Sequence, residues 1–176
     1  MTVQSVELLL DREVERRVRA VWQALAAAGL PSQARHLAPS NRPHLTLVAV
    51  GALPADADDL LPAQVGELPV AGTWGRVAEF GHGPWTVVRL VEPSAGMRAL
   101  QARVAGVCGV PADSLTTPER WTPHVTLAPR VGAEALARVH AVVAVATDHG
   151  GDRDGDPVLA TGIRRWDGAA RREWPV

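Results

Sequence analysis

Apolar residues at every second position open the chain. In residues 3–10, VQSVELLL, this spacing is typical of a β-strand with one buried face. From Asp11, a plausible helix N-cap, apolar residues recur instead at intervals of three and four as far as Leu25. Gly29 and Pro31 then end the pattern. A strand followed at once by an amphipathic helix is therefore predicted.

The rest of the chain continues to alternate between strand and helix patterns. The expected elements are a strand from 44, a short helix over 55–65 interrupted by Pro62, a hairpin of 67–80 and 84–92, a helix over 94–108, a strand from 124, a short helix over 133–140, a strand over 140–148, and two terminal strands joined at 166–170. Hairpins mixed with helices favour an α+β fold over a doubly wound parallel sheet.

One five-residue pattern occurs twice, as PHLTL at 43–47 and as PHVTL at 123–127. Each copy begins a predicted strand, and each strand has a helix before it and a helix after it. This arrangement indicates two similar lobes with structural pseudo-symmetry. We expect them to form one two-lobed unit over residues 1–176.

Strand geometry determines what the two copies can present. Side chains at positions i and i+2 share a face, so His44 lies beside Thr46 and His124 beside Thr126, while the intervening apolar residues face the opposite layer. A single His-x-Thr is a weak signal, typical of an ordinary strand. Two copies that face one cleft would bring two imidazoles and two hydroxyls to one ligand.

Displacement at phosphorus suits such a site. A base activates the attacking oxygen on one side, and an acid protonates the leaving oxygen on the other. Histidine can serve in either role because its ordinary pKa is about 6.5. Threonine hydroxyls can donate hydrogen bonds to the non-bridging oxygens as negative charge builds on them. This chemistry needs no metal and no cofactor.

Composition and charge exclude several other classes. The chain has 47% hydrophobic and 21% charged residues, which is typical of a folded protein. All 18 basic residues are arginine, yet the formal net charge is −1. A long electrostatic track for duplex DNA or RNA is therefore not expected, although a small phosphate site is. Nothing in the sequence requires a partner copy, so a monomer is the default expectation.

The single cysteine, Cys108, cannot form an internal disulfide, and it falls on an apolar helix face where a buried, inert thiol is expected. This pattern favours a reducing cytoplasm. The N-terminal segment has no basic leader, and its apolar run is far shorter than the ~20 residues that span a bilayer. We expect no membrane association.

Metal sites are poorly supported by the sequence. Neither motif has Cys, Asp or Glu at the spacing of a zinc site. The segment DRDGDP resembles the start of a calcium loop, but Pro157 stands where glycine is needed and Ile163 where glutamate is needed. A solvated loop is expected there.

The paired motifs at 43–47 and 123–127 resemble the signature of the two-histidine phosphoesterase superfamily, in its 2′-5′ RNA ligase-like (LigT-like) branch. The resemblance implies two antiparallel sheets that line a V-shaped cleft, with helices outside. It also implies a metal-independent phosphoesterase for 2′,3′-cyclic phosphates of nucleotides or RNA ends, with possible reversal to 2′-5′ ligation. His44 and His124 would be the acid and base, and Thr46 and Thr126 the phosphate binders.

The residues that select the substrate are harder to predict. Many relatives of the ligase type follow the second motif with Ala-Arg, whereas here Pro129 moves the arginine to Arg130. A shift of one residue can reverse the direction of a strand side chain. Five candidates for substrate contact come from this reasoning and from base stacking: Arg42, Arg130, Phe80, Trp85 and Trp121.

Two alternatives to a metal-independent phosphoesterase remain open from the sequence. One is a non-catalytic module that binds nucleotides or RNA ends in the same cleft. The other is a metal-dependent hydrolase, which a chelator would inhibit.

Overall fold

The structure is a computed structural model that describes residues 2–66, 68–150 and 152–176. Its strands are β1 (Gln4–Leu10), β2 (His44–Val50), β3 (Val70–Phe80), β4 (Trp85–Pro93), β5 (His124–Val131), β6 (Pro157–Asp167) and β7 (Arg172–Pro175). Its α-helices are α1 (Arg12–Ala27), α2 (Ala57–Leu60), α3 (Ala95–Val107) and α4 (Ala133–Gly150), and two 3₁₀-helices are η1 (Gln33–Arg35) and η2 (Leu61–Gln64). This confirms the predicted α+β class.

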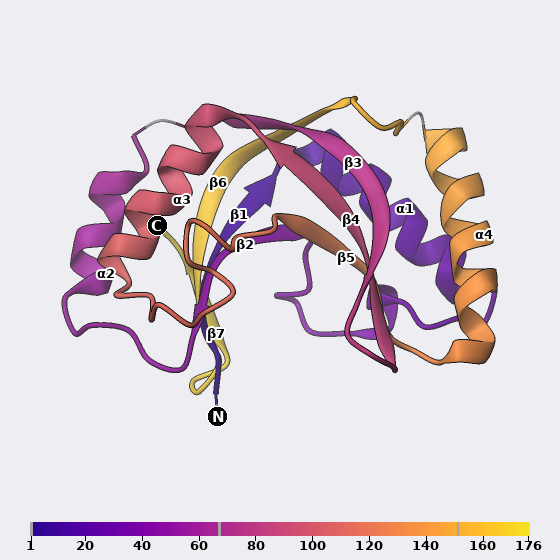
Figure 1. The fold of residues 1–176 in the computed structure, drawn as a ribbon, viewed down its shortest axis with the longest axis horizontal. Coiled ribbons are helices and arrows are strands. Elements are labelled where there is room, and N and C mark those ends of the chain that lie inside the picture. The colour runs from indigo at the N-terminus through magenta and orange to yellow at the C-terminus, as the bar shows by residue number, and fades with distance from the viewer. Residues whose placement is uncertain (1, 67, 151) are drawn as a thin grey trace.

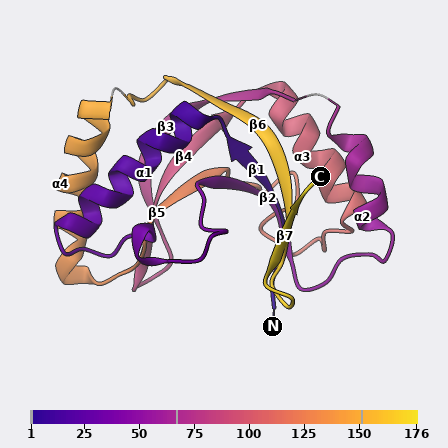
Figure 2. The same ribbon diagram turned by 180° about the vertical axis from the view of Figure 1, so that it is seen from behind.

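All seven strands belong to one open antiparallel sheet, in the order β2-β1-β6-β3-β4-β5, with β7 added against β6. The sheet bends into an arch with two lobes, as Figures 1 and 2 show. The two strands that carry the motifs, β2 and β5, form its two edges. The bend brings these edges close to each other at the centre of the molecule, where the two strands are in contact.

Strand β6 joins the two lobes. Its first residues, Pro157–Ala160, pair with β3, and the stretch from Ala160 to Asp167 pairs with β1. The two sheets expected from the sequence are therefore two halves of one hydrogen-bonded sheet.

Helices cover the outer faces of the lobes (Figure 1). Helices α1 and α4 pack together over the β5 side, while α3 packs on β2 and β3. The predicted N-cap of α1 is confirmed, since the Asp11 carboxylate accepts a hydrogen bond of 2.8 Å from the Val14 amide. Ser94 caps α3 in the same way.

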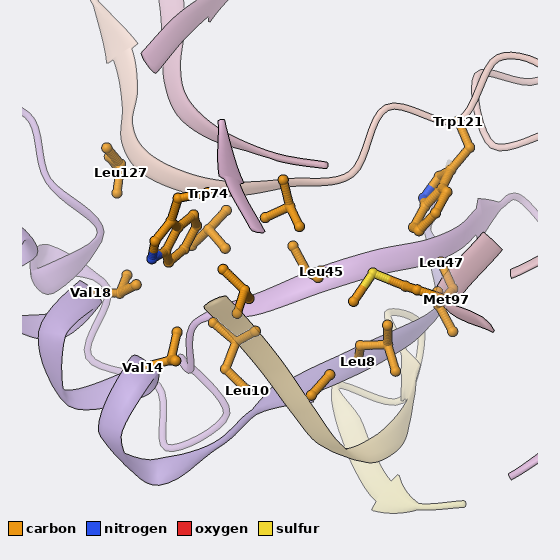
Figure 3. Packing of buried hydrophobic residues seen from close by; sticks show 14 of the residues in the cluster. Leu8, Leu10, Val14, Val18, Leu45, Leu47, Trp74, Met97, Trp121 and Leu127 are labelled. Carbon is orange, nitrogen blue, oxygen red and sulfur yellow. The ribbon is translucent and has the colours of Figure 1, made fainter. Parts of the chain in front are cut away.

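A continuous apolar core fills the space between helices and sheet (Figure 3). Val14 and Val18 of α1 lie near Trp74, and Met97 of α3 lies near Leu47. The core also contains Cys108, which is only 1% exposed, and burial raises the pKa of its thiol to about 11. A thiol with so high a pKa is a poor nucleophile, in line with the expectation from the sequence.

One predicted strand is wrong. Residues 140–148 belong to α4, which runs without interruption from Ala133 to Gly150. Val139 and Val143, four residues apart, are its buried residues, so the apolar period is that of a helix. Alanine, the best helix former, is frequent in the segment, and this outweighs the alternation that suggested a strand.

The acidic loop at 152–157 is more than a solvated turn. Asp152 is only 6% exposed, and its carboxylate accepts hydrogen bonds from Arg17 of α1 at 2.7 Å and from the Trp74 indole at 3.1 Å. The expectation of full solvation is thus wrong for Asp152, because this carboxylate ties α1 to β3. Separately, none of the helices in the described ranges is long and apolar enough to cross a membrane.

The junction of the lobes leaves no room for a side chain at Gly72. A Cβ there would lie 2.7 Å from Val91 Cγ1 and 2.8 Å from the Glu92 carbonyl oxygen, which belongs to the paired backbone. We expect Gly72→Ala to lower the free energy of unfolding by about 1–3 kcal/mol, measured by urea denaturation. Gly51→Ala is the matched control, because nothing lies within 4 Å of its added Cβ. Equal stability of the two variants would contradict this view of the junction.

Candidate active site

The predicted alternation holds in both motif strands. His44 and Thr46 are partly exposed, while Leu45 and Leu47 between and beyond them are fully buried. Strand β5 repeats the pattern, with His124 and Thr126 partly exposed and the adjoining apolar residues buried. Within the described part of the chain neither threonine hydroxyl has a protein hydrogen-bond partner, so both can donate to a ligand.

The two imidazoles are held in the same way. His44 Nδ1 lies 2.7 Å from the Arg42 carbonyl oxygen, and His124 Nδ1 lies 2.8 Å from the Thr122 carbonyl oxygen. A carbonyl oxygen only accepts, so Nδ1 carries the proton and donates in both cases. This fixes each ring and leaves Nε2 as the unprotonated ring nitrogen.

Two indoles bind the motif strands at their open edges. Trp22 Nε1 donates to the Thr126 carbonyl oxygen at 2.9 Å, and Trp121 Nε1 donates to the Thr46 carbonyl oxygen at 2.8 Å. Each edge strand thus receives a hydrogen bond at the threonine of its motif. A narrow crevice lined by residues of both motifs, among them His44 and Thr126, lies between the strands.

His44 has a buried carboxylate beside it. Glu7 of β1 pairs with Thr46 in the sheet, and its Oε1 lies 3.7 Å from His44 Nε2. Arg164 of β6 binds the same carboxylate, with Nε at 2.7 Å from Oε2, and Ser5 donates to Oε1 at 2.7 Å. Burial by itself would raise the pKa of Glu7, but the charges of His44 and Arg164 and the Ser5 hydroxyl together bring it below its ordinary value.

Arg164 extends this network away from His44. Its Nη1 donates to the Ser40 carbonyl oxygen at 2.8 Å and also binds the carboxylate of Glu173 on β7. The guanidinium is almost fully buried, and two carboxylates and a carbonyl compensate its charge. Because these partners come from β1, β7 and the loop at Ser40, the buried cation holds the three segments together beside His44.

His124 lies in a different environment. The Phe80 ring packs against the imidazole in an edge-on contact, with ring centroids 4.8 Å apart. Burial lowers the pKa of His124; the hydrogen bond to the Thr122 carbonyl acts in the opposite direction, and the charge of His44 lowers the pKa further. The charge of His44 affects the pKa of His124 because the two imidazoles lie near each other.

Of the five candidates for substrate contact, Phe80 is the one whose side chain packs against a motif histidine. Arg42 supports His44 through its carbonyl, but its guanidinium binds Glu15 on α1 at 2.7 Å. Trp121 is 7% exposed, and its indole is occupied by Thr46, which leaves little surface for stacking.

Trp85 and Arg130 lie apart from the histidines. Strand alternation places Trp85 on the side of β4 that carries Val87, which packs away from the cleft. Arg130 has a left-handed backbone with φ of +52° and lines a separate pocket of about 760 Å³ beside η1. The arginine that follows Pro129 therefore lines this pocket and not the crevice between the motifs.

Glu7 and Arg164 were missed in the sequence. Glu7 stands between the buried Val6 and Leu8, and Arg164 follows the buried Ile163, so each is a charged residue on the face opposite the core. That pattern was visible at Glu7, within VELLL, but the pairing of β1 with both β2 and β6 could not be read from it. Among the residues that the structure describes, no group of three or more His, Cys, Asp or Glu side chains could hold a metal ion.

A two-lobed α+β fold with one His-x-Thr pair on each of two facing edge strands is the arrangement of two-histidine phosphoesterases. The sequence profile described as the 2′-5′ RNA ligase superfamily matches residues 10–158, and the chain belongs to this family. No curated protein sequence matches the chain.

Solved structures support the same fold. The apo form of Escherichia coli LigT has a TM-score of 0.57 at 16% identity, covering 99% of this chain and 94% of LigT. LigT complexed with 3′-AMP has a TM-score of 0.52 at 17% identity, covering 98% and 95%. A structure described as a phosphoesterase has a TM-score of 0.51 at 16% identity, covering 100% and 96%. At these identities the similarity establishes the fold alone.

The pKa of His124 can be tested directly. We expect its imidazole to titrate below the ordinary histidine pKa of about 6.5 in NMR spectra. Phe80→Ala should admit water, stabilise the imidazolium and raise the midpoint, whereas Phe80→Leu should raise it less because it retains an apolar side chain. A midpoint that Phe80→Ala leaves unchanged would contradict desolvation as the cause.

Proposed function

We propose that this protein opens 2′,3′-cyclic phosphodiesters of nucleotides or RNA ends, without a metal, through acid-base catalysis by His44 and His124. The observation that carries the proposal is the matched pair of imidazoles, each with Nδ1 on a backbone carbonyl and Nε2 left for proton transfer. In-line displacement at phosphorus needs one proton acceptor and one proton donor.

The different surroundings of the two histidines support different roles. Desolvation favours neutral His124, the form that accepts a proton, so we assign it as the base. His44 is the other imidazole of the pair, and the Glu7 carboxylate lies 3.7 Å from its Nε2. We therefore assign His44 as the acid.

The reaction follows from these roles. His124 takes a proton from water as its oxygen bonds to phosphorus, and His44 gives a proton to the 3′ oxygen as its bond to phosphorus breaks. The product is a 2′-phosphate monoester and a free 3′ hydroxyl. Thr46 and Thr126, which have unoccupied hydroxyls, would donate to the non-bridging oxygens as their charge increases. The same steps with a 5′ hydroxyl in place of water would join two ends in a 2′-5′ linkage and again leave a free 3′ hydroxyl.

A nucleotide or RNA end suits the site better than a long duplex, given the net charge of −1. LigT structures are described with 3′-AMP and with phosphate. The shared fold makes a nucleotide phosphate the natural ligand class to test for this chain.

The first test is turnover of 2′,3′-cyclic nucleotides and cyclic-phosphate-ended oligonucleotides in EDTA. We expect monoester products, and a fall in kcat of about 10²–10⁴-fold for His44→Ala and for His124→Ala. His149→Ala, on the exposed end of α4, is the matched control and should keep wild-type activity.

The alternatives give different outcomes in this assay. Tight nucleotide binding without turnover, unchanged by either histidine variant, would instead identify a binding module. Activity that EDTA abolishes would identify a metal-dependent hydrolase. Full turnover by both histidine variants would exclude the proposed chemistry.

Glu7→Gln tests the assigned acid. The substitution keeps the size of the side chain and an oxygen for Arg164, but it removes the charge beside His44. The carboxylate 3.7 Å from His44 Nε2 is then lost, so kcat for 2′,3′-cyclic nucleotides should fall. The acidic limb of the pH–rate profile, assigned to His124, should stay in place. A wild-type kcat, or a change confined to the acidic limb, would contradict the assignment.

A further inference from the structure

Trp121 lies in the segment that joins α3 to β5, residues 108–123, three positions before His124. Its side chain is directed toward the other motif strand. The indole Nε1 donates to the Thr46 carbonyl oxygen at 2.8 Å, and the buried ring lies near Leu47 of β2 (Figure 3). A residue next to one motif is therefore bonded to the strand that carries the other motif.

The segment that contains Trp121 is held against β2 at further points. The side-chain amide of Gln101, a buried residue of α3, donates to the Leu47 carbonyl oxygen at 3.2 Å and to the Thr116 carbonyl oxygen at 2.8 Å. The backbone amide of Ala49 donates to the Thr116 hydroxyl at 3.4 Å. These bonds fix the position of the segment relative to the first motif.

The backbone between the Trp121 indole and the His124 imidazole is short and well held. The Thr122 carbonyl oxygen binds His124 Nδ1 at 2.8 Å, and the Pro123 carbonyl oxygen accepts a hydrogen bond of 2.9 Å from the Val91 amide of β4. Two consecutive carbonyls are thus occupied between the two rings. A displacement of Trp121 relative to β2 would therefore be transmitted to His124.

Trp22 makes a bond of the same kind within one lobe. Its indole donates to the Thr126 carbonyl oxygen at 2.9 Å, and its helix, α1, also packs against β5. The Trp121 bond instead joins the segment that leads into β5 to strand β2. The backbone ladder of the sheet connects these two strands the long way round, through β1, β6, β3 and β4. Trp121 therefore provides a direct link between the two motifs.

We infer that Trp121 is a positioning residue, whose indole N–H sets the separation of His44 and His124. The inference rests on the proposed function, in which the two imidazoles must reach opposite sides of one phosphorus atom. Because its ring is buried and its N–H is bound to Thr46, Trp121 acts through the motifs and not by contact with the substrate. A misplacement of about 1 Å at a reacting group can cost about 10²-fold in rate.

Trp121→Phe tests the inference with adenosine 2′,3′-cyclic phosphate as substrate. The variant keeps an aromatic ring in the core and removes the N–H, so we expect kcat to fall about 10–100-fold while KM changes less than about threefold. Trp74→Phe is the matched control, because Trp74 is also buried and its indole also donates one hydrogen bond, to Asp152 at 3.1 Å. It should lose a similar amount of stability in thermal melting and keep kcat within about twofold of the wild type.

A double-mutant cycle measures the separation of the rings without turnover. The charge of His44 lowers the pKa of His124, so His44→Ala should raise the midpoint of the His124 titration in NMR spectra. This effect weakens as the two rings move apart. The rise should therefore be smaller in the Trp121→Phe background than in the wild-type background, and undiminished in the Trp74→Phe background. A loss of stability alone would not change this coupling.

Gln101→Met provides a second arm, which also serves if Trp121→Phe does not fold. It removes the amide bonds to Leu47 and Thr116 and keeps a side chain of similar length, so the segment is loosened from β2 while the indole bond remains available. We expect changes in the same direction as for Trp121→Phe, with lower kcat and weaker coupling between the histidines, but of smaller size.

Three outcomes would overturn the inference: a wild-type kcat in Trp121→Phe, a coupling between His44 and His124 that Trp121→Phe leaves unchanged, or a loss of kcat that Trp74→Phe reproduces in full. Each of these leaves the proposed function standing. If the wild type turns over no cyclic phosphate, the proposed function fails instead, and the NMR cycle still decides whether Trp121 sets the separation of the rings.

Discussion

Two hydrogen bonds from indoles to strand carbonyls hold together the part of the molecule on which the site depends. Trp22 binds the Thr126 carbonyl and Trp121 binds the Thr46 carbonyl. These carbonyls lie on β2 and β5, the two edges of the sheet, where no further strand is available to pair with them. An unpaired buried carbonyl costs about 1–3 kcal/mol. The arched sheet can therefore bring its edges together without leaving these groups unsatisfied, and the two motifs meet as a result.

The two motifs differ in the charged groups that surround their histidines. Both imidazoles are fixed through Nδ1 by a carbonyl two residues earlier, so the local sequence Pro-His accounts for their common orientation. His44, however, has the buried Glu7 and Arg164 as neighbours, whereas His124 has the apolar ring of Phe80. A pseudo-symmetric scaffold thereby places its two imidazoles in different surroundings. Such a difference suits a reaction with one acid and one base.

Local patterns were sufficient for the parts of the fold that depend on neighbouring residues. The alternation around His44, the N-cap at Asp11 and the α+β class were all predicted, because strand period and capping are local properties. The helix at 140–148 was misassigned, since a short Val- and Ala-rich run fits both periods until its partners are known. Glu7 and Arg164, 157 residues apart in the chain, became part of the site only through the pairing of β1 with β6. Sequence reasoning has no access to that register.

The central claim is that one histidine accepts a proton and the other donates one at the same phosphorus. The most direct measurement is the pH–rate profile of cyclic-phosphate opening, in EDTA, for the wild type and for the residual activity of each single histidine variant. The wild-type profile should be bell-shaped; His124→Ala should lose the acidic limb and His44→Ala the alkaline limb. A variant profile that keeps both limbs would contradict the claim.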